Sequence, residues 1–320
     1  MDRRAFLIAT CLGAVPLRAD ANSRRLGFIS SSTTSLDSPF LIALRQGLSE
    51  RGYEEGRNLE IAYRFAQARA ELPAMAADLV ARRVEVMVAA GSEGILAARD
   101  ATTTIPIVMA NSGDAVREGF VASLDKPGGN ITGMTQISPE LAGKRLEILR
   151  EIFPGLTRVG ILWNPVHPNT PLTFDEAKAA AVRLGIAPVS VEAREPGDIR
   201  PGLERVAAQG VQGFLVIRDP FTVRNRRAII DVLHARHLLA IFETSDFLDA
   251  GGLMFYGADF ADLFRRSAAY VDKILKGARP GDLPVEQPTK FVLGINNKVA
   301  GERGIAIPQA LLIRADHVID

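Results

Sequence analysis

Val159-Gly160-Ile161-Leu162-Trp163 is a run of apolar residues without a charged side chain. A strand that is apolar at nearly every position is typical of a parallel sheet, because helices bury both of its faces. Similar runs recur along the 320-residue chain and alternate with helical segments. This alternation predicts an α/β protein whose parallel sheets are covered on both faces. We expect strands over Leu26–Ser30, Leu59–Arg64, Val84–Ala89, Ile107–Ala110, Ile131–Met134, Arg158–Trp163, Ala187–Glu192, Gly213–Ile217, Leu239–Phe242, Leu253–Tyr256 and Phe291–Ile295.

The helices expected between these strands carry start and stop signals. Ser38-Pro39 places an N-cap residue before a proline at the first helical position, and Gly52 stands where this helix should end. The longest amphipathic stretch begins at Asp259 and ends at Lys276, an order of charges that suits the helix dipole. These signals predict helices from Pro39 to the residue before Gly52 and from Asp259 to Lys276.

The first 21 residues are typical of an export signal. Arg3-Arg4 opens a basic segment, Ala5 to Leu17 is an uncharged apolar run, and Ala19-Asp20-Ala21 is a small-residue cleavage pattern. The run is too short to span a bilayer as an anchor. We therefore expect a periplasmic protein that is cleaved after Ala21 and exported by either the general secretory or the twin-arginine route.

Composition argues against several classes of function. The signal carries three arginines and two aspartates, a net charge of +1, which equals the charge of the whole chain. The mature protein is then formally neutral and lacks the basic surface that nucleic acids or anionic membranes require. Cys11 is the chain's one cysteine and lies within the signal. We therefore expect no disulfide, no thiolate nucleophile and no cysteine metal site.

The known motifs for catalysis and cofactor binding are incomplete. Gly128-x4-Gly133 has the glycine spacing of a P-loop, but Met134-Thr135 stands where Lys-Ser/Thr is required. Gly91-Ser92-Glu93-Gly94 lacks one spacer residue of the nucleophile elbow. His234 and His237 have a spacing that zinc ligands can have, but the sequence suggests no third ligand. We expect no catalytic residues, no cofactor and no metal.

Polar residues follow the carboxyl ends of several predicted strands, which is where ligands bind in open parallel sheets. Their hydroxyls, amides and carboxylates suit a small zwitterion, because helix N-termini and hydroxyls can bind its carboxylate while an acidic residue binds its ammonium. The candidate ligand-binding residues are Ser31, Ser32, Gly91, Ser92, Asn111, Asp114, Asn164, Asp219, Glu243 and Tyr256. Thr33, Thr34, Ser112, Arg218 and Thr244 occupy similar positions.

Within this group we assign the ammonium to Asp219 or Glu243, and the carboxylate to Ser31, Ser32, Ser92 and Asn111. Each candidate also has a purely structural interpretation. Asp219 before Pro220 can cap a helix, and Asn164 before Pro165 can form a turn.

Segments rich in glycine and proline indicate where the chain passes between two halves. The candidates are residues 126–133, 249–253 and 279–284. No low-complexity linker is present. We therefore expect a hinge that bends about a few backbone dihedral angles while each half stays rigid.

Several stretches of the sequence are distinctive when taken together. They are Phe40-x4-Arg45-Gln46-Gly47-Leu48, Gly52-Tyr53-x2-Gly56-Arg57-Asn58, Ile105-Pro106-Ile107-Val108, Pro127-Gly128-Gly129-Asn130-Ile131-Thr132-Gly133, Gly251-Gly252-Leu253-Met254-x-Tyr256-Gly257, Tyr270-Val271-Asp272-Lys273-Ile274-Leu275-Lys276-Gly277 and Gln287-Pro288-Thr289-Lys290-Phe291. With them the chain resembles, from about Arg25 to Asp320, the ABC importer substrate-binding proteins often labelled as tryptophan/tyrosine or aromatic amino acid transport components.

The resemblance implies a type I periplasmic binding protein, with two Rossmann-like α/β lobes, parallel sheets, three hinge crossings and a ligand in the cleft. It places the N-terminal lobe at residues 22–133 plus 258–283, and the C-terminal lobe at 134–257 plus 284–320. It also implies an inner-membrane permease and its ATPase as partners. We expect a non-catalytic monomer that captures a small polar solute, such as an amino acid or related organic acid. A periplasmic sensor that feeds a membrane receptor would have the same sequence features.

Overall fold

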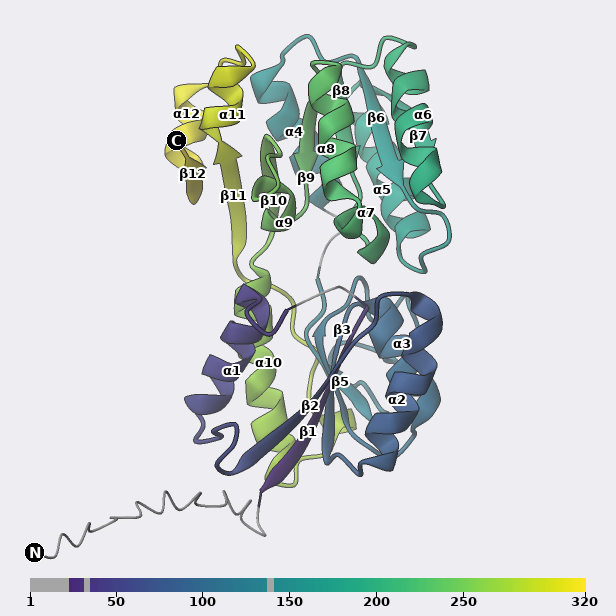
Figure 1. Ribbon diagram of the computed structural model, residues 1–320, viewed down its shortest axis with the longest axis vertical. Coiled ribbons are helices and arrows are strands. Elements are labelled where there is room, and N and C mark those ends of the chain that lie inside the picture. Colours follow the sequence, from purple (N-terminus) through teal and green to yellow (C-terminus); the bar gives the residue numbers. More distant parts are fainter. Residues whose placement is uncertain (1–22, 32–34, 137–140) are drawn as a thin grey trace, which may run out of the picture.

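The computed structural model describes residues 23–31, 35–136 and 141–320. It shows two lobes, one above the other in Figure 1, and each is built on its own sheet with helices packed against it. The predicted class, two α/β lobes with mostly parallel strands, is confirmed. The export signal predicted at residues 1–21 lies outside the described residues.

The first lobe contains a five-stranded parallel sheet in the order β2-β1-β3-β4-β5. Helices α1 and α10 pack on one face of the sheet, and α2 and α3 pack on the other. The elements are β1 (Arg24–Ser30), α1 (Pro39–Ser49), β2 (Leu59–Phe65), the 3-10 helix η1 (Arg69–Glu71), α2 (Leu72–Ala81), β3 (Val86–Ala90), α3 (Ser92–Ala101), β4 (Ile107–Asn111), β5 (Ile131–Gly133), α10 (Phe260–Leu275) and the 3-10 helix η3 (Pro280–Asp282).

The second lobe contains a seven-stranded sheet in the order β12-β11-β10-β9-β8-β6-β7. Helices α4 and α5 pack on one face, and α6 and α8 pack on the other. The elements are α4 (Ala142–Ile152), β6 (Arg158–Trp163), α5 (Thr170–Arg183), β7 (Ala187–Glu192), α6 (Pro196–Ala207), β8 (Gly213–Val216), α7 (Pro220–Arg224), α8 (Arg226–Ala235), β9 (Leu239–Phe242), α9 (Ser245–Leu248), β10 (Met254–Ala258), β11 (Phe291–Asn296), α11 (Asn297–Glu302), α12 (Gln309–Arg314) and β12 (His317–Ile319).

One strand pair departs from the predicted parallel arrangement. β10 and β11 are antiparallel, because the chain leaves the second lobe after β10, forms α10 on the first lobe, and comes back from the cleft side (Figure 1). β12 was not predicted, since it is short and two of its three residues are exposed.

The chain passes between the lobes after β5, after β10 and after η3. Asp259 caps α10 by accepting the backbone N–H of Asp262 at 3.0 Å, so the predicted start of this helix is confirmed. The predicted crossing at residues 249–253 is wrong. Gly251, with φ of 97°, belongs to a turn within the second lobe, and β10 then continues to Ala258 before the chain crosses.

A buried ion pair joins α4 to the segment after β9 in the second lobe. Nη1 of Arg145 lies 3.2 Å from Oε1 of Glu243, and the two side chains are only 2% and 5% exposed. The Nε–H of Arg145 also donates to the carbonyl oxygen of Tyr256 at 2.7 Å. A buried ion pair of this kind is strongly destabilised when one partner is lost, because the remaining charge has no counter-ion.

We predict that Arg145→Met lowers the free energy of unfolding by about 3–5 kcal/mol, since it leaves the Glu243 carboxylate buried without its cation. Lys144→Met is the matched control on the same helix. Its ion pair with Glu147 is solvent-exposed and should contribute less than about 1 kcal/mol. Urea denaturation of both variants measures the difference, and equal small losses would contradict the prediction.

Candidate ligand-binding site

A cavity of about 60 Å³ lies between the lobes, where the carboxyl ends of both sets of strands meet. The first lobe lines it with the segments that follow β1, β3 and β4, and the second lobe with those that follow β6, β8 and β9. The strand-end rule therefore located the cavity correctly from both halves of the sequence.

Half of the candidate residues line this cavity. These are Ser31, Gly91, Ser92, Asn111 and Asp219. Ser32 lies outside the described residues, as do Thr33 and Thr34. Ser112 and Arg218, which occupy similar positions, also line it. Ligand binding by any of these residues stays a prediction.

Four candidates are not among the lining residues. Asn164 lies behind the cavity and donates its Nδ2–H to Oδ2 of Asp219 at 2.8 Å. Asp114 lies on the neighbouring loop, where its Oδ1 accepts two backbone N–H groups. Glu243 is paired with Arg145. Tyr256 does not follow a strand as expected, because β10 continues past it, and its ring instead stacks on that of Phe291.

The first lobe presents hydroxyls and a helix N-terminus to the cavity. Gly91 has φ of 80°, a left-handed conformation that favours glycine, and α3 begins directly after it at Ser92. The first N–H groups of a helix lack intrahelical acceptors and attract anions. The Oγ of Ser31 is buried and has no hydrogen-bond partner among the described residues. These groups together favour a carboxylate.

Arg218 is the positive charge on the cavity wall. Its Nε–H donates to Oγ1 of Thr244 at 3.2 Å, and its Nη2 lies 3.4 Å from Oδ2 of Asp246. Its guanidinium carbon lies 5.0 Å from the ring centre of Phe260, which belongs to α10 of the first lobe. Asp246 therefore neutralises Arg218 within the second lobe, while the aromatic ring contacts it from across the cleft.

Asp219 and His167 supply the remaining polar groups of the second lobe. Asp219 caps α7, since its Oδ1 accepts the backbone N–H of Thr222 at 2.7 Å, so its structural interpretation is confirmed. A carboxylate with one bond on each oxygen still has lone pairs for a further donor. Burial lowers the pKa of His167 to about 4, so the ring is neutral near pH 7. Its Nδ1 accepts the backbone N–H of Asn169 at 3.4 Å, which places the ring proton on Nε2.

The apolar wall of the cavity was not predicted from the sequence. Phe40, Phe260 and Phe264 line it from α1 and α10, and the ring of Phe40 lies 5.8 Å and 5.5 Å from those of the other two. They lie on apolar helix faces, and such faces read as ordinary core in a sequence. His167 and Asn169 were missed because they lie several residues beyond the end of β6.

The family model for ABC transporter substrate binding proteins matches residues 35–319. The chain belongs to this family. A tyrosine-binding protein of Clostridioides difficile is 24% identical over 243 residues, which cover 75% of this chain and 69% of that protein.

Solved structures agree with this substrate-binding fold. A Streptococcus pneumoniae ABC domain in complex with L-Trp has a TM-score of 0.86 and 24% identity, and covers 93% of this chain and 100% of that one. A conserved domain protein of Vibrio cholerae gives 0.85 and 28%, covering 92% and 99% of the two chains. A ligand-free, open substrate-binding protein of Clostridium difficile gives 0.69 and 20%, again covering 92% and 99%.

The members of this family are substrate-binding proteins of ABC transporters. Within the part of the chain that the structure describes, no helix is long and apolar enough to cross a bilayer. The same part contains no group of three His, Cys, Asp or Glu side chains placed to hold a metal ion.

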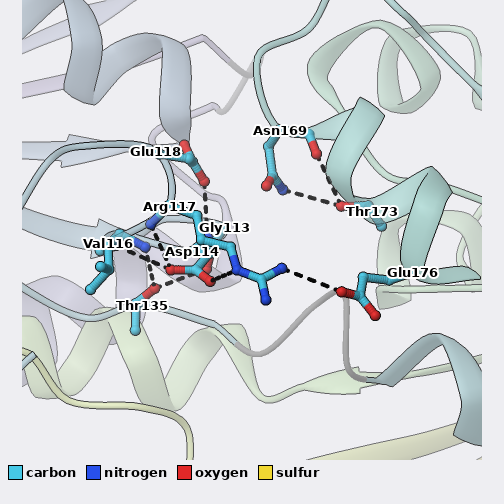
Figure 2. Close-up of polar contacts among 10 residues, drawn as sticks. Gly113, Asp114, Val116, Arg117, Glu118, Thr135, Asn169, Thr173 and Glu176 are labelled. Carbon is cyan, nitrogen blue, oxygen red and sulfur yellow. Dashed lines mark hydrogen bonds and ion pairs between the residues drawn. The ribbon is translucent and has the colours of Figure 1, made fainter.

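The loop of residues 112–118 lies opposite α5 (Figure 2), and its residues Ser112 and Gly113 line the cavity between the lobes. Glu118 lies on this loop, and its Oε1 accepts the backbone N–H of Asp114 at 2.9 Å. Its Oε2 is buried and has no hydrogen-bond partner among the described residues. Burial raises the pKa of Glu118 from 4.5 to about 7, so the folded state favours the neutral acid.

We predict that Glu118→Gln stabilises the protein at pH 8 and has little effect at pH 5. The folded carboxyl keeps its proton up to about pH 7 and the unfolded one only to 4.5, so its ionisation makes the folded state progressively less stable as the pH rises between these values. The Gln oxygen can still accept the Asp114 N–H, and the melting temperature at pH 8 should rise by about 2–4 °C.

Thermal unfolding at the two pH values measures this effect. Glu60→Gln is the control, because Glu60 is exposed on β2. An increase in melting temperature that is the same at pH 5 and pH 8 would show that ionisation of Glu118 does not destabilise the folded protein.

Proposed function

We propose that this protein captures one small zwitterion, an amino acid or related organic acid, between its lobes and delivers it to an inner-membrane permease with its ATPase. The proposal is carried by the charge distribution on the cavity wall. Among the lining residues Asp246 neutralises Arg218, and His167 is neutral because burial lowers its pKa to about 4. Asp219 is then the unbalanced charge, which favours a ligand with an ammonium group.

The opposite wall suits the other end of such a molecule. Ser31, Ser92 and the start of α3 present hydroxyl and backbone donors from the first lobe. A zwitterion with its ammonium at Asp219 and its carboxylate at α3 would contact both lobes at once. Binding that contacts both lobes favours the closed state, since a ligand shifts an equilibrium only by its differential affinity for the two states.

The similar proteins support an amino acid as the ligand class, since one is named for tyrosine and another contains L-Trp. We assign residues 22–133 plus 258–283 to one lobe and 134–257 plus 284–320 to the other. The strands β1 to β5 lie within 22–133, and α10, which packs on their sheet, lies within 258–283. The strands of the other sheet lie in the remaining two ranges, apart from Ala258 at the end of β10. We further propose that residues 1–21 direct export to the periplasm and that the protein acts there as a monomer.

Titration calorimetry with amino acids, organic acids, sugars and nucleosides tests this function. We predict that Asp219→Asn weakens binding of the preferred amino acid by about 10- to 100-fold, because a charge-assisted hydrogen bond to the ammonium is lost. Asparagine still caps a helix well, so α7 should remain folded.

Asp259→Asn is the matched control, because it makes the same change at the N-cap of α10. Asp259 does not line the cavity. It should bind the amino acid as tightly as the unaltered protein does. Binding of sugars or nucleosides, with no amino acid bound, would show that the proposed ligand class is wrong.

A further inference from the structure

Beside the ligand cavity, the loop of residues 112–118 contacts one face of α5 across the cleft (Figure 2). Nη1 of Arg117, on the first lobe, lies 3.3 Å from Oε1 of Glu176, on the second. Asn169, Thr173 and Glu176 are spaced by four and three residues, so they share one face of α5. This face of the helix is turned toward the first lobe.

Arg117 is held in place by its own lobe before it reaches the other. Its Nε lies 3.5 Å from Oδ2 of Asp114. Oδ1 of Asp114 in turn accepts the backbone N–H groups of Val116 at 3.1 Å and Arg117 at 3.0 Å. A side chain that is already ordered loses less conformational entropy when it pairs across the cleft. The carboxylates of Asp114 and Glu176 therefore bind one guanidinium from opposite sides of the cleft.

The loop is fixed to the first crossing between the lobes. Thr135, just after β5, donates its hydroxyl to the carbonyl oxygen of Gly113 at 2.8 Å. Its Oγ1 also accepts the backbone N–H of Ala115 at 3.1 Å and the hydroxyl of Ser112 at 3.0 Å. The loop must therefore move with the first lobe as a rigid part of it. Any rotation at this crossing changes the separation of Arg117 and Glu176.

The two lobes also meet closely at Gly113. A Cβ atom on this residue would lie 2.4 Å from Cγ of Asn169, well inside contact distance, and 2.3 Å from Oε1 of Glu118. The Asn169 side chain is 8% exposed, and its Nδ2–H donates to Oγ1 of Thr173 at 3.4 Å. The packing of Glu118 within the loop and the observed approach of the lobes therefore both need a residue without a side chain at position 113.

We propose that Asp114, Arg117 and Glu176 form an interlobe latch, seated by the contact of Gly113 with Asn169. None of the three latch residues lines the ligand cavity. The latch stabilises the closed form and sets the rate at which a captured solute leaves. Because the latch lies outside the ligand cavity, it affects the affinity for whichever solute the cleft binds. Its effect on release rests on the proposed capture function.

A charge swap tests the latch. Arg117→Glu should speed the dissociation of L-tyrosine, used as the probe, by about three- to tenfold, because it replaces attraction to Glu176 by repulsion. Adding Glu176→Arg should recover most of this loss. High ionic strength should diminish the effect, because the pair is solvent-exposed.

Arg314→Glu is the matched control. Arg314 pairs with Glu151 at 2.9 Å with similar exposure, but both residues belong to the second lobe. This variant should leave the dissociation rate unchanged. Equal rates for Arg117→Glu and Arg314→Glu would overturn the proposal.

A second measurement tests the latch independently of which ligand the protein binds. Spin labels on cysteines introduced at the exposed Glu60 and Gln209, with Cys11→Ser, report the interlobe distance with no ligand added. Arg117→Glu and Gly113→Ala should both lower the closed fraction. Gly129→Ala, where a Cβ would meet nothing within 4 Å, should not. If L-tyrosine fails to bind, that result counts against the amino acid assignment, and the distance measurement alone decides on the latch.

Discussion

The function of this protein depends on one geometric constraint, that the carboxyl ends of two separate sheets face each other across a cleft. Neither sheet forms this cavity by itself, since the lining residues come from strand ends of both lobes. The first lobe contributes backbone and hydroxyl donors, and the second contributes charged side chains. Under the proposed function, a solute with two opposite ends contacts both lobes only when they are brought together, so full recognition requires closure.

The charged groups of the second lobe divide into two kinds. Glu243 and Arg145 are almost fully buried and form an ion pair that joins α4 to the segment after β9. Asp219 and Arg218 reach the cavity wall from the segment after β8. The difference lies in where each residue sits relative to the cleft. Glu243 is buried within the second lobe, whereas Arg218 and Asp219 reach the cavity.

The sequence predicts the central strands closely, and Arg158–Trp163 is found residue for residue because its apolar run is unbroken. The sequence-based prediction is wrong where one sequence pattern is compatible with two different structures. Gly251 and Gly252 were interpreted as a crossing, but the chain turns there within the second lobe. The strand that follows was predicted to end at Tyr256, whereas β10 continues to Ala258. Phe260 was not predicted to line the cavity, because a helix face that packs in a core and one that borders a cavity have the same apolar pattern in the sequence. Tertiary packing alone distinguishes them.

The position of α10 has a consequence for how the polypeptide folds during synthesis. This helix packs on α1, and Tyr53, in the segment after α1, donates its hydroxyl to Asp272 at 3.0 Å. Among the elements that the structure describes, one apolar face of the N-terminal sheet therefore has α1 as its sole helical cover until residue 275 has emerged from the ribosome, long after its own strands are complete. The lobe that is synthesised first is therefore completed late. Until α10 packs on it, this lobe presents an apolar surface to which a chaperone can bind.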